Sequence, residues 1–192
     1  TSAFVASYCG AKVAKHGNRS ATRKSGSADL LEQAGVSLDL SPDQVASCIE
    51  QVGLGFMFAQ AHHSAMRHVV GPRKEIGQKS IFNILGPLTN PASAKRQVMG
   101  VYNKDLMIPV AEVLKELGSE HVLIVHSEDG LDEISIASPT LVTEMKYGKI
   151  SEYKICPEDF NFSTSSLEGL LVKTPEESLK IAKSALKGDH EQ

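Results

Sequence analysis

The spacing of apolar residues along this chain switches between the helical and the strand period. Apolar residues at helical spacing predict helices within residues 2–15, 28–33, 41–53, 62–77, 105–118 and 174–188. Short and densely apolar runs predict strands within residues 53–60, 96–103 and 121–130. Segment 140–160 predicts a β-hairpin. Helices therefore alternate with strands along most of the chain.

Capping and turn residues mark several of the expected boundaries. Ser41 with Gln44, and Thr174 with Glu177, follow the spacing of a capped helix N-terminus. The tripeptide at 147–149, Tyr-Gly-Lys, predicts the turn of the hairpin. Prolines and asparagines in 82–94 predict a turn in place of a continuous helix or strand.

This alternation predicts the α/β class, with a central mixed or parallel sheet flanked by helices. No internal repeat, low-complexity tract or linker divides the 192 residues, so we expect one domain, or most of one, over residues 1–192. The sequence starts without methionine inside an expected helix and stops just after another. We therefore expect a segment of a longer protein.

Composition and charge exclude several classes of partner. Apolar residues make up 41% of the chain, but no apolar run approaches the roughly 20 residues of a membrane span. The formal net charge of −3 does not favour binding to nucleic acid or anionic lipid. The three cysteines, Cys9, Cys48 and Cys156, are few and far apart, which favours a reducing cytoplasm over a disulfide framework or zinc site.

A loop rich in cations and small residues follows the first expected helix. Its cations and polar residues are Lys15, His16, Asn18, Arg19, Arg23 and Lys24. Gly17 and Gly26 allow the backbone to approach a ligand closely, and Ser27 is expected to cap the helix at 28–33. These features are typical of a phosphate or pyrophosphate site, although a solvated basic loop has the same composition. No Walker or dinucleotide fingerprint is present.

A second cluster is acidic and follows the strand expected at 121–130. It contains Glu128, Asp129, Asp132 and Glu133. Adjacent carboxylates repel each other unless a cation lies between them, and Mg²⁺ binds one or two carboxylates together with substrate phosphates. Ligands of open α/β sheets gather at the carboxyl ends of strands. A magnesium site is one interpretation, and a solvated acidic turn is the other.

One further segment has a weaker signal. The segment 62–77 contains His62, His63 and His68, without the spacing of a zinc protease, and then Arg73. An arginine matches a carboxylate with two parallel hydrogen bonds, so Arg73 is a candidate for holding an acidic substrate. The histidines serve equally well as structural hydrogen-bonding groups.

Together these motifs resemble the anthranilate phosphoribosyltransferase family of tryptophan biosynthesis. The motifs KHGNRS, KSGSADLLEQAG, HHSAMRHVVGPRKEIG, FNILGPLTNP and HSEDGLDEIS occur in the order of that family and cover nearly the whole chain. The resemblance implies the nucleoside phosphorylase-like and phosphoribosyltransferase-like fold. It also implies that this chain is the central part of a larger α/β domain. The helical domain and glycine-rich pyrophosphate loop of the family do not occur in it.

The resemblance implies a role for each matching residue. It implies that phosphoribosyl pyrophosphate (PRPP) is bound by Lys15, His16, Gly17, Asn18, Arg19, Ser20, Ala21, Thr22, Arg23 and Ser27. It implies that anthranilate is bound by Asn18, Arg73 and His63, and Mg²⁺ by Asp132 and Glu133. His16 is a candidate proton acceptor, with a structural role for its ring as the alternative.

The implied reaction transfers the phosphoribosyl group of PRPP to the amine of anthranilate and releases pyrophosphate. We expect a cytoplasmic homodimer as the whole protein, with no nucleic-acid or membrane partner, and no activity from the 192 residues alone. Three alternatives stay open at this point: a pyrimidine nucleoside phosphorylase of the same fold, a non-catalytic homologue that binds nucleic acid, and a structural segment with vestigial sites.

Overall fold

The computed structural model describes residues 1–19, 25–62 and 82–188, and the chain divides into two compact units. The first unit contains Thr1–Lys79 and Leu170–Gln192, and the second contains Ser80–Gly169. Each unit has its own sheet and its own apolar core. None of the helices in the described ranges is long and apolar enough to cross a lipid bilayer.

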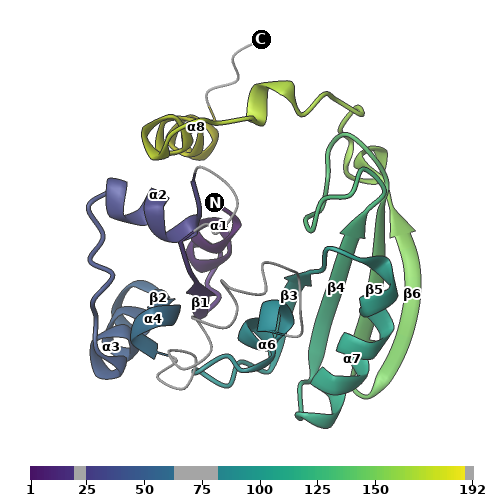
Figure 1. Ribbon diagram of the computed structural model, residues 1–192, viewed down its shortest axis with the longest axis horizontal. Coiled ribbons are helices and arrows are strands. Elements are labelled where there is room, and N and C mark those ends of the chain that lie inside the picture. Colours follow the sequence, from purple (N-terminus) through teal and green to yellow (C-terminus); the bar gives the residue numbers. More distant parts are fainter. Residues whose placement is uncertain (20–24, 63–81, 189–192) are drawn as a thin grey trace. The chain divides into compact units, whose positions relative to one another are not determined.

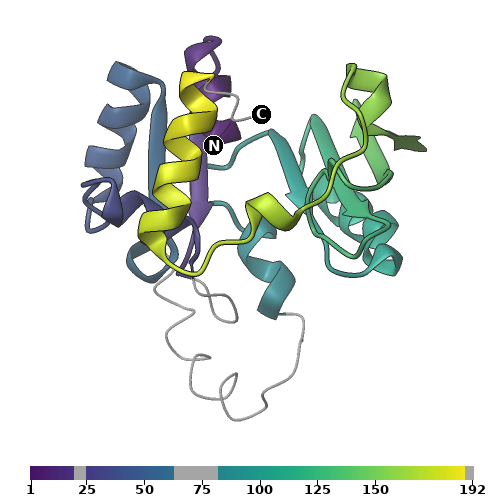
Figure 2. The same cartoon turned by 90° about the horizontal axis from the view of Figure 1, so that it is seen from above.

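The first unit combines short helices with a two-stranded parallel sheet. Its elements are α1 (Ser2–Tyr8), β1 (Val13–Gly17), α2 (Ser27–Gln33), α3 (Pro42–Val52), β2 (Leu54–Phe58), α4 (Ala59–His62) and α8 (Pro175–Lys187). The last helix packs against α2, although the two lie far apart in the sequence (Figure 1, Figure 2). The core of the unit consists of Ala28, Leu31, Leu38, Phe56 and Phe58.

The prediction of a helix over residues 2–15 is wrong in its second half. The helix α1 ends at Tyr8, Gly10 has a positive φ of 94°, and β1 follows. The strand forms because β2 offers a parallel partner, with Val13 opposite Leu54 and Gly17 opposite Phe58. Tertiary pairing therefore outweighs the local helical spacing of the apolar residues.

The expected helix and strand at 41–60 are confirmed. Ser41 Oγ accepts a hydrogen bond from Gln44 N, and the Gln44 side chain accepts one from Ser41 N, which completes the capping box. Gly53 ends α3 with a φ of 80°, and β2 starts at the next residue. A Cβ on Gly55 would lie 2.7 Å from Ile49 Cγ1, so this glycine lets α3 pack closely on β2.

The second unit is a four-stranded mixed sheet with α7 against it (Figure 1). Its elements are α6 (Phe82–Leu88), β3 (Arg96–Gly100), η2 (Lys104–Leu106), α7 (Met107–Glu116), β4 (His121–Ser127), β5 (Thr140–Lys146), β6 (Lys149–Ile155) and η3 (Pro157–Phe160). A short 3-10 helix, η4 (Glu168–Leu170), follows at the boundary with the first unit. The strand order is β3-β4-β5-β6.

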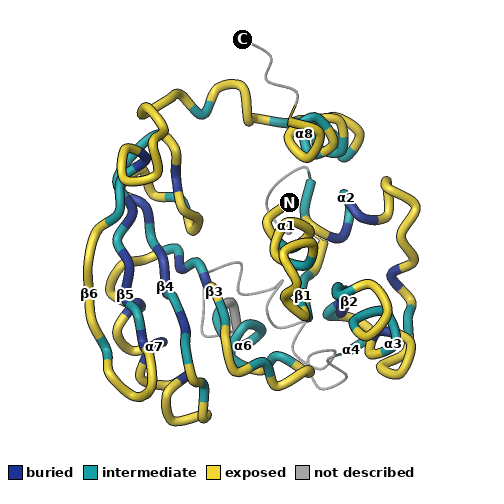
Figure 3. Tube along the Cα trace, turned by 180° about the vertical axis from the view of Figure 1, so that it is seen from behind, coloured by how far each residue is buried: buried dark blue, intermediate teal, exposed yellow. Residues whose placement is uncertain are grey.

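Strands β3 and β4 are parallel, and the other neighbours are antiparallel. The connection from β3 to β4 runs through α7, as a parallel pair requires. The core between α7 and the sheet contains Met99, Val101, Met107, Val110, Ala111, Leu114, Val122, Ile124 and Met145. Buried residues gather on β4 and β5, whereas the edge strand β6 is exposed along most of its length (Figure 3). The strands predicted at 96–103 and 121–130 and the helix at 105–118 are confirmed.

The turn expected over residues 82–94 is wrong in its first half, which forms the helix α6 with Pro87 near its end. Side chains satisfy the carbonyl groups at that end, because Thr89 Oγ1 donates to Leu85 O and Gln97 Nε2 donates to Pro87 O. Ile84 and Leu88 pack against the core. Apolar burial and these hydrogen bonds explain why the helix tolerates its proline.

The hairpin and the last helix are confirmed. Tyr147 and Gly148 both have positive φ, the conformation that a two-residue hairpin turn requires. Thr174 Oγ1 accepts a hydrogen bond from Glu177 N at the start of α8. The Glu177 carboxylate accepts from Lys173 N, so the second half of the predicted capping box is displaced by one residue. The helix expected over 62–77 lies outside the described residues beyond His62.

Candidate functional site

The basic loop begins at the carboxyl end of β1. Lys15, His16 and Gly17 are the last residues of this strand, and Asn18 and Arg19 continue from it. A Cβ on Gly17 would lie 2.9 Å from Phe56 Cε2 and 3.7 Å from Ser27 Cβ. Gly17 is therefore packed too closely for a side chain, and Ser27 lies beside it. The structure brings the two described ends of the loop together at one end of the β1–β2 sheet.

Ser27 is the first residue of α2 and not its N-cap, which corrects the sequence-based expectation. Gly26 occupies the N-cap position with a φ of −120°. The Asp29 carboxylate accepts a hydrogen bond from Gly26 N at 2.9 Å, so the third helical residue satisfies the backbone donor that precedes the helix. Ser27 remains exposed at the end of the loop.

The amide side chain of Asn18 has a defined orientation. Asn18 Oδ1 accepts a hydrogen bond from Arg19 N at 2.8 Å, which leaves the NH₂ group of the side chain as a donor. Asn18 is exposed, as Lys15 is, whereas His16 is partly buried. A hydrogen-bond donor and an ammonium group at the start of the loop suit an anionic ligand.

Arg19 is paired with two carboxylates of α2. Its Nη1 and Nη2 atoms donate to the two oxygens of Glu32 at 2.7 and 2.9 Å, and Nη1 also donates to Asp29 at 3.0 Å. The guanidinium lies over the Phe58 ring, 5.8 Å from its centroid. The hydrogen bonds that Arg19 donates to Glu32 and Asp29 raise the pKa of Arg19 above its ordinary value, and those to Glu32 lower the pKa of Glu32. Arg19 and Glu32 are therefore both charged at neutral pH.

Several predicted site residues lie outside the described part of the chain. In the basic loop these are Ser20, Ala21, Thr22 and Arg23, and the two anthranilate candidates are His63 and Arg73. Their assignments stay predictions.

The acidic segment follows β4 in the second unit. Ser127 N donates to Leu131 O, and Gly130 N donates to Ser127 O, so the chain turns tightly after the strand. Because β3 and β4 are parallel, their carboxyl ends lie at the same edge of the sheet. Asp132 and Glu133 follow this turn and are exposed.

The first two carboxylates of this segment, Glu128 and Asp129, bind to protein groups. Glu128 pairs with Lys154 on β6. Asp129 accepts from Ser135 Oγ at 2.6 Å and from Leu131 N at 3.1 Å. Desolvation raises the pKa of Asp129, but these hydrogen bonds outweigh it and hold the pKa below its ordinary value. Glu128 and Asp129 therefore stabilise the segment.

Buried hydroxyl groups extend this network beneath the turn. Ser127 and Ser138 share a hydrogen bond of 3.0 Å between their Oγ atoms, and Ser138 Oγ also accepts from Asp129 N. Ser135 N donates to Thr140 Oγ1. Ser127, Ser135 and Thr140 are buried, so the polar groups that support the turn are shielded from water.

Gly100, the last residue of β3, contacts the backbone of the acidic segment. A Cβ built on Gly100 would overlap the carbonyl oxygen and carbon of Asp132. Only glycine fits there without displacing Asp132. Sequence reasoning missed this residue, because a glycine at the end of an apolar strand has no chemical signal of its own.

Within the described ranges, no group of three or more His, Cys, Asp or Glu side chains has the geometry of a metal site. The exposed pair Asp132 and Glu133 instead has the composition of a magnesium site that is completed by substrate oxygens and water. The two side chains fit Mg²⁺ in chemical type, because both are carboxylates.

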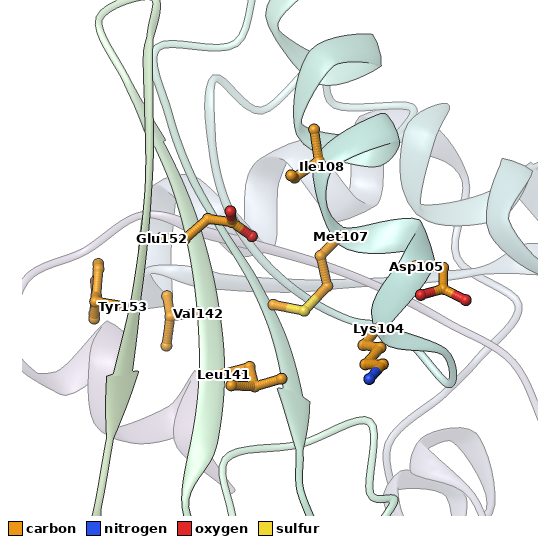
Figure 4. Close-up of a pocket in the computed structure, with 8 residues that line it drawn as sticks. All are labelled: Lys104, Asp105, Met107, Ile108, Leu141, Val142, Glu152 and Tyr153. Carbon is orange, nitrogen blue, oxygen red and sulfur yellow. The ribbon is translucent and has the colours of Figure 1, made fainter.

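A cavity of about 280 Å³ lies between the start of α7 and strands β5 and β6 (Figure 4). Its lining residues are Lys104, Asp105, Met107, Ile108, Leu141, Val142, Glu152 and Tyr153. Met107 points from the helix toward the strands that carry Leu141 and Glu152 (Figure 4). None of these eight is a predicted site residue. Burial raises the pKa of Tyr153, and the nearby Glu144 carboxylate raises it further.

Comparison with known proteins gives consistent matches. The profile of the glycosyl transferase family, a/b domain, matches residues 1–192. The anthranilate phosphoribosyltransferase of Ectopseudomonas mendocina is 61% identical over 184 residues, which are 96% of this chain and 53% of that protein. The chain therefore spans about half the length of the curated relatives that it matches.

Solved structures agree with this similarity. Anthranilate phosphoribosyltransferase from Thermus thermophilus superposes with a TM-score of 0.91 at 44% identity, covering 99% of this chain and 56% of that one. The enzyme from Saccharomyces cerevisiae in complex with PRPP and Mg superposes with a TM-score of 0.88 at 30% identity, covering 98% of this chain and 52% of that one.

Proposed function

Because this chain belongs to the glycosyl transferase family, a/b domain, we propose that its full-length protein transfers the phosphoribosyl group of PRPP to anthranilate. The reaction would join the amine nitrogen of anthranilate to C1 of the ribose and release pyrophosphate. The observation that carries the proposal is the 61% identity to an anthranilate phosphoribosyltransferase over almost the whole chain. The predicted PRPP, anthranilate and magnesium motifs all fall within that matched region.

The basic loop supplies the proposed PRPP site. Lys15 provides a cation and Asn18 a hydrogen-bond donor at the carboxyl end of β1, and Ser27 provides a hydroxyl group beside Gly17. The further loop residues Ser20, Ala21, Thr22 and Arg23 belong to the same proposed site. Donors that are fixed before the reaction stabilise the charge that develops on the departing pyrophosphate.

Asp132 and Glu133 are the proposed ligands of Mg²⁺. When bound, Mg²⁺ would neutralise part of the negative charge on the leaving pyrophosphate. The hydrogen bonds of Asp129 hold the backbone that carries the two carboxylates. This backbone also packs against Gly100, where a side chain would displace it. These backbone contacts support the proposal that the two carboxylates are held close to their binding position before the metal and substrate arrive.

Anthranilate needs orientation more than activation. The lone pair of an aromatic amine is available near neutral pH, so a strong base is not required. Arg73 would pair with the anthranilate carboxylate, while Asn18 and His63 would contact the same substrate. Holding two reactants in the correct geometry lowers the barrier substantially. His16 at the end of β1 is the candidate acceptor for the amine proton.

We propose a cytoplasmic homodimer as the state of the full-length protein. The formal net charge of −3 makes a nucleic-acid partner unfavourable, because such partners require neutralisation of many phosphates by cations. The distribution of the three cysteines favours a reducing compartment. Both proposed magnesium ligands, Asp132 and Glu133, are present, which argues against a vestigial site.

The substitution Arg73→Ala tests the substrate assignment. Loss of a charged hydrogen bond costs about 1.5–3 kcal/mol, so the KM for anthranilate is expected to rise about tenfold or more in the full-length protein. The KM for PRPP should change little. Steady-state kinetics with each substrate varied in turn measures both constants.

The matched control for this experiment is Arg96→Ala, which removes an exposed arginine of β3 that pairs with Glu120. It should leave both constants near their original values. An equal rise in the two KM values of Arg73→Ala would contradict the assignment of Arg73 to anthranilate.

A further inference from the structure

We propose that Arg19 is a positioning residue that closes the base of the PRPP loop by pairing with α2, and that it is not a phosphate ligand. This inference rests on the proposed function of the loop. It changes the role that the family resemblance implies for Arg19. The resemblance places the whole run from Lys15 to Arg23 on the substrate.

The contacts of Arg19 connect the two ends of the loop. Arg19 follows β1, and its guanidinium forms two parallel hydrogen bonds to Glu32 on α2. Such a bidentate pair fixes both the distance and the orientation of the two groups. Asp29 joins the same cluster, accepting from Arg19 through one oxygen and from Gly26 N through the other. The entry and the exit of the loop are thus held by one set of hydrogen bonds.

The apolar neighbours restrict this cluster further. The guanidinium lies over Phe58, which belongs to the core of the first unit. Gly17 packs against Phe56 and lies beside Ser27, so the loop ends also meet through van der Waals contact. The cluster joins β1, β2 and α2, and these three elements define where the loop starts and ends.

The charges of the cluster oppose a direct role in phosphate binding. One guanidinium faces the two carboxylates of Asp29 and Glu32, which gives the group an excess of negative charge. The lowered pKa of Glu32 keeps that carboxylate ionised at neutral pH. A phosphate that approached Arg19 would have to displace a carboxylate from it and would be repelled by the other. Within the described residues, no carboxylate pairs with Lys15, Asn18 or Ser27.

The substitution Glu32→Gln distinguishes the two possible roles of Arg19, because they predict changes of opposite sign in the affinity for PRPP. If Arg19 bound phosphate directly, loss of the competing carboxylate would tighten PRPP binding. If Arg19 positions the loop, the same loss weakens binding, and we expect the Kd for PRPP with Mg²⁺ to rise roughly threefold or more. Titration calorimetry on the full-length protein measures this Kd.

Glu50→Gln on α3 is the matched control, because it removes an exposed carboxylate of the same unit without touching the loop. It should leave the Kd unchanged. Arg19→Lys is the second variant: it keeps the charge but loses the bidentate geometry, so it should weaken PRPP binding as Glu32→Gln does. Unchanged or tighter binding by Glu32→Gln would overturn the proposal, as would equal weakening by the control.

Limited trypsin digestion supplies a readout that does not depend on PRPP. Cleavage after Arg19 should be faster in Glu32→Gln than in the unmodified protein and in Glu50→Gln, because the guanidinium then loses its bidentate partner. Equal cleavage rates would overturn the positioning role. Failure of the unmodified protein to bind PRPP would instead overturn the proposed function, so the two failures are distinguishable.

Discussion

Asp132 lies where it does because Gly100 has no side chain. The Asp132 carbonyl occupies the space that a Cβ on Gly100 would fill. The acidic segment therefore lies directly against Gly100, the last residue of β3, which contributes no functional group. Positioning of the proposed magnesium ligands depends on this close backbone contact.

The substitution Gly100→Ala is expected to displace Asp132 and weaken Mg²⁺ binding. Substitution of a residue that orients metal ligands typically lowers the metal affinity by about 10–100-fold. We therefore expect the apparent Kd for Mg²⁺ to rise about tenfold. Titration of Mg²⁺ into the full-length protein with PRPP measures it. Gly169→Ala is the control, because nothing lies within 4 Å of its Cβ position. Equal Mg²⁺ affinity in the two variants would show that Gly100 does not position the ligands.

Residue identity predicts a chemistry for each motif of the candidate site, but it does not predict which side chains pair with each other. Cations, amides and carboxylates could be assigned to anion and metal binding from their type and spacing. The partner of Arg19 could not, because Glu32 lies 13 positions away and reaches it only after α2 packs beside β1. The role of Gly100 was also beyond prediction, since it depends on a segment that returns to the strand 32 positions later.

A network of hydrogen bonds holds the turn after β4. Asp129 accepts from Ser135 and Leu131, and Ser127 and Ser138 pair beneath it. The lowered pKa of Asp129 links this network to pH. The stabilising contribution of the carboxylate is fully present above its unfolded-state pKa, near 3.9, and is lost as the pH falls through its lower folded-state pKa.

The substitution Asp129→Asn should remove this acid-dependent contribution. We expect the variant to have a lower Tm than the unmodified protein at pH 7, with the difference shrinking as the pH falls below about 4. Thermal unfolding across that pH range measures the effect. Asp105→Asn serves as the control, because Asp105 is an exposed carboxylate of the same unit. A Tm difference that does not depend on pH would contradict the assignment of the network to the ionised form of Asp129.

Elements with complete local signals were predictable, and elements that depend on distant partners were not. Ser41 and Gln44 fixed the start of α3, and the turn at Tyr147–Gly148 fixed the hairpin. The strand β1 was predicted as a helix because its pairing with β2 is about 40 positions away. The helix α6 was missed because its proline obscured the burial of Ile84 and Leu88.

At the scale of the whole molecule, each of the two units contains one of the proposed binding motifs. The basic loop belongs to the first unit and the acidic segment to the second. Each motif alone had a plain alternative, such as a solvated loop or turn. Their joint order along the chain was specific, and the similarity of residues 1–192 to the glycosyl transferase family confirms the predicted fold class.

The most direct test of this account is a two-substrate assay of the full-length protein with Mg²⁺, PRPP and anthranilate. The account predicts that one pyrophosphate is released for each anthranilate consumed. It also predicts a product whose mass equals the sum of the masses of anthranilate and PRPP minus the mass of pyrophosphate. Omission of either substrate should abolish the release. Absence of this product, or phosphate-dependent cleavage of a pyrimidine nucleoside in its place, would contradict the account.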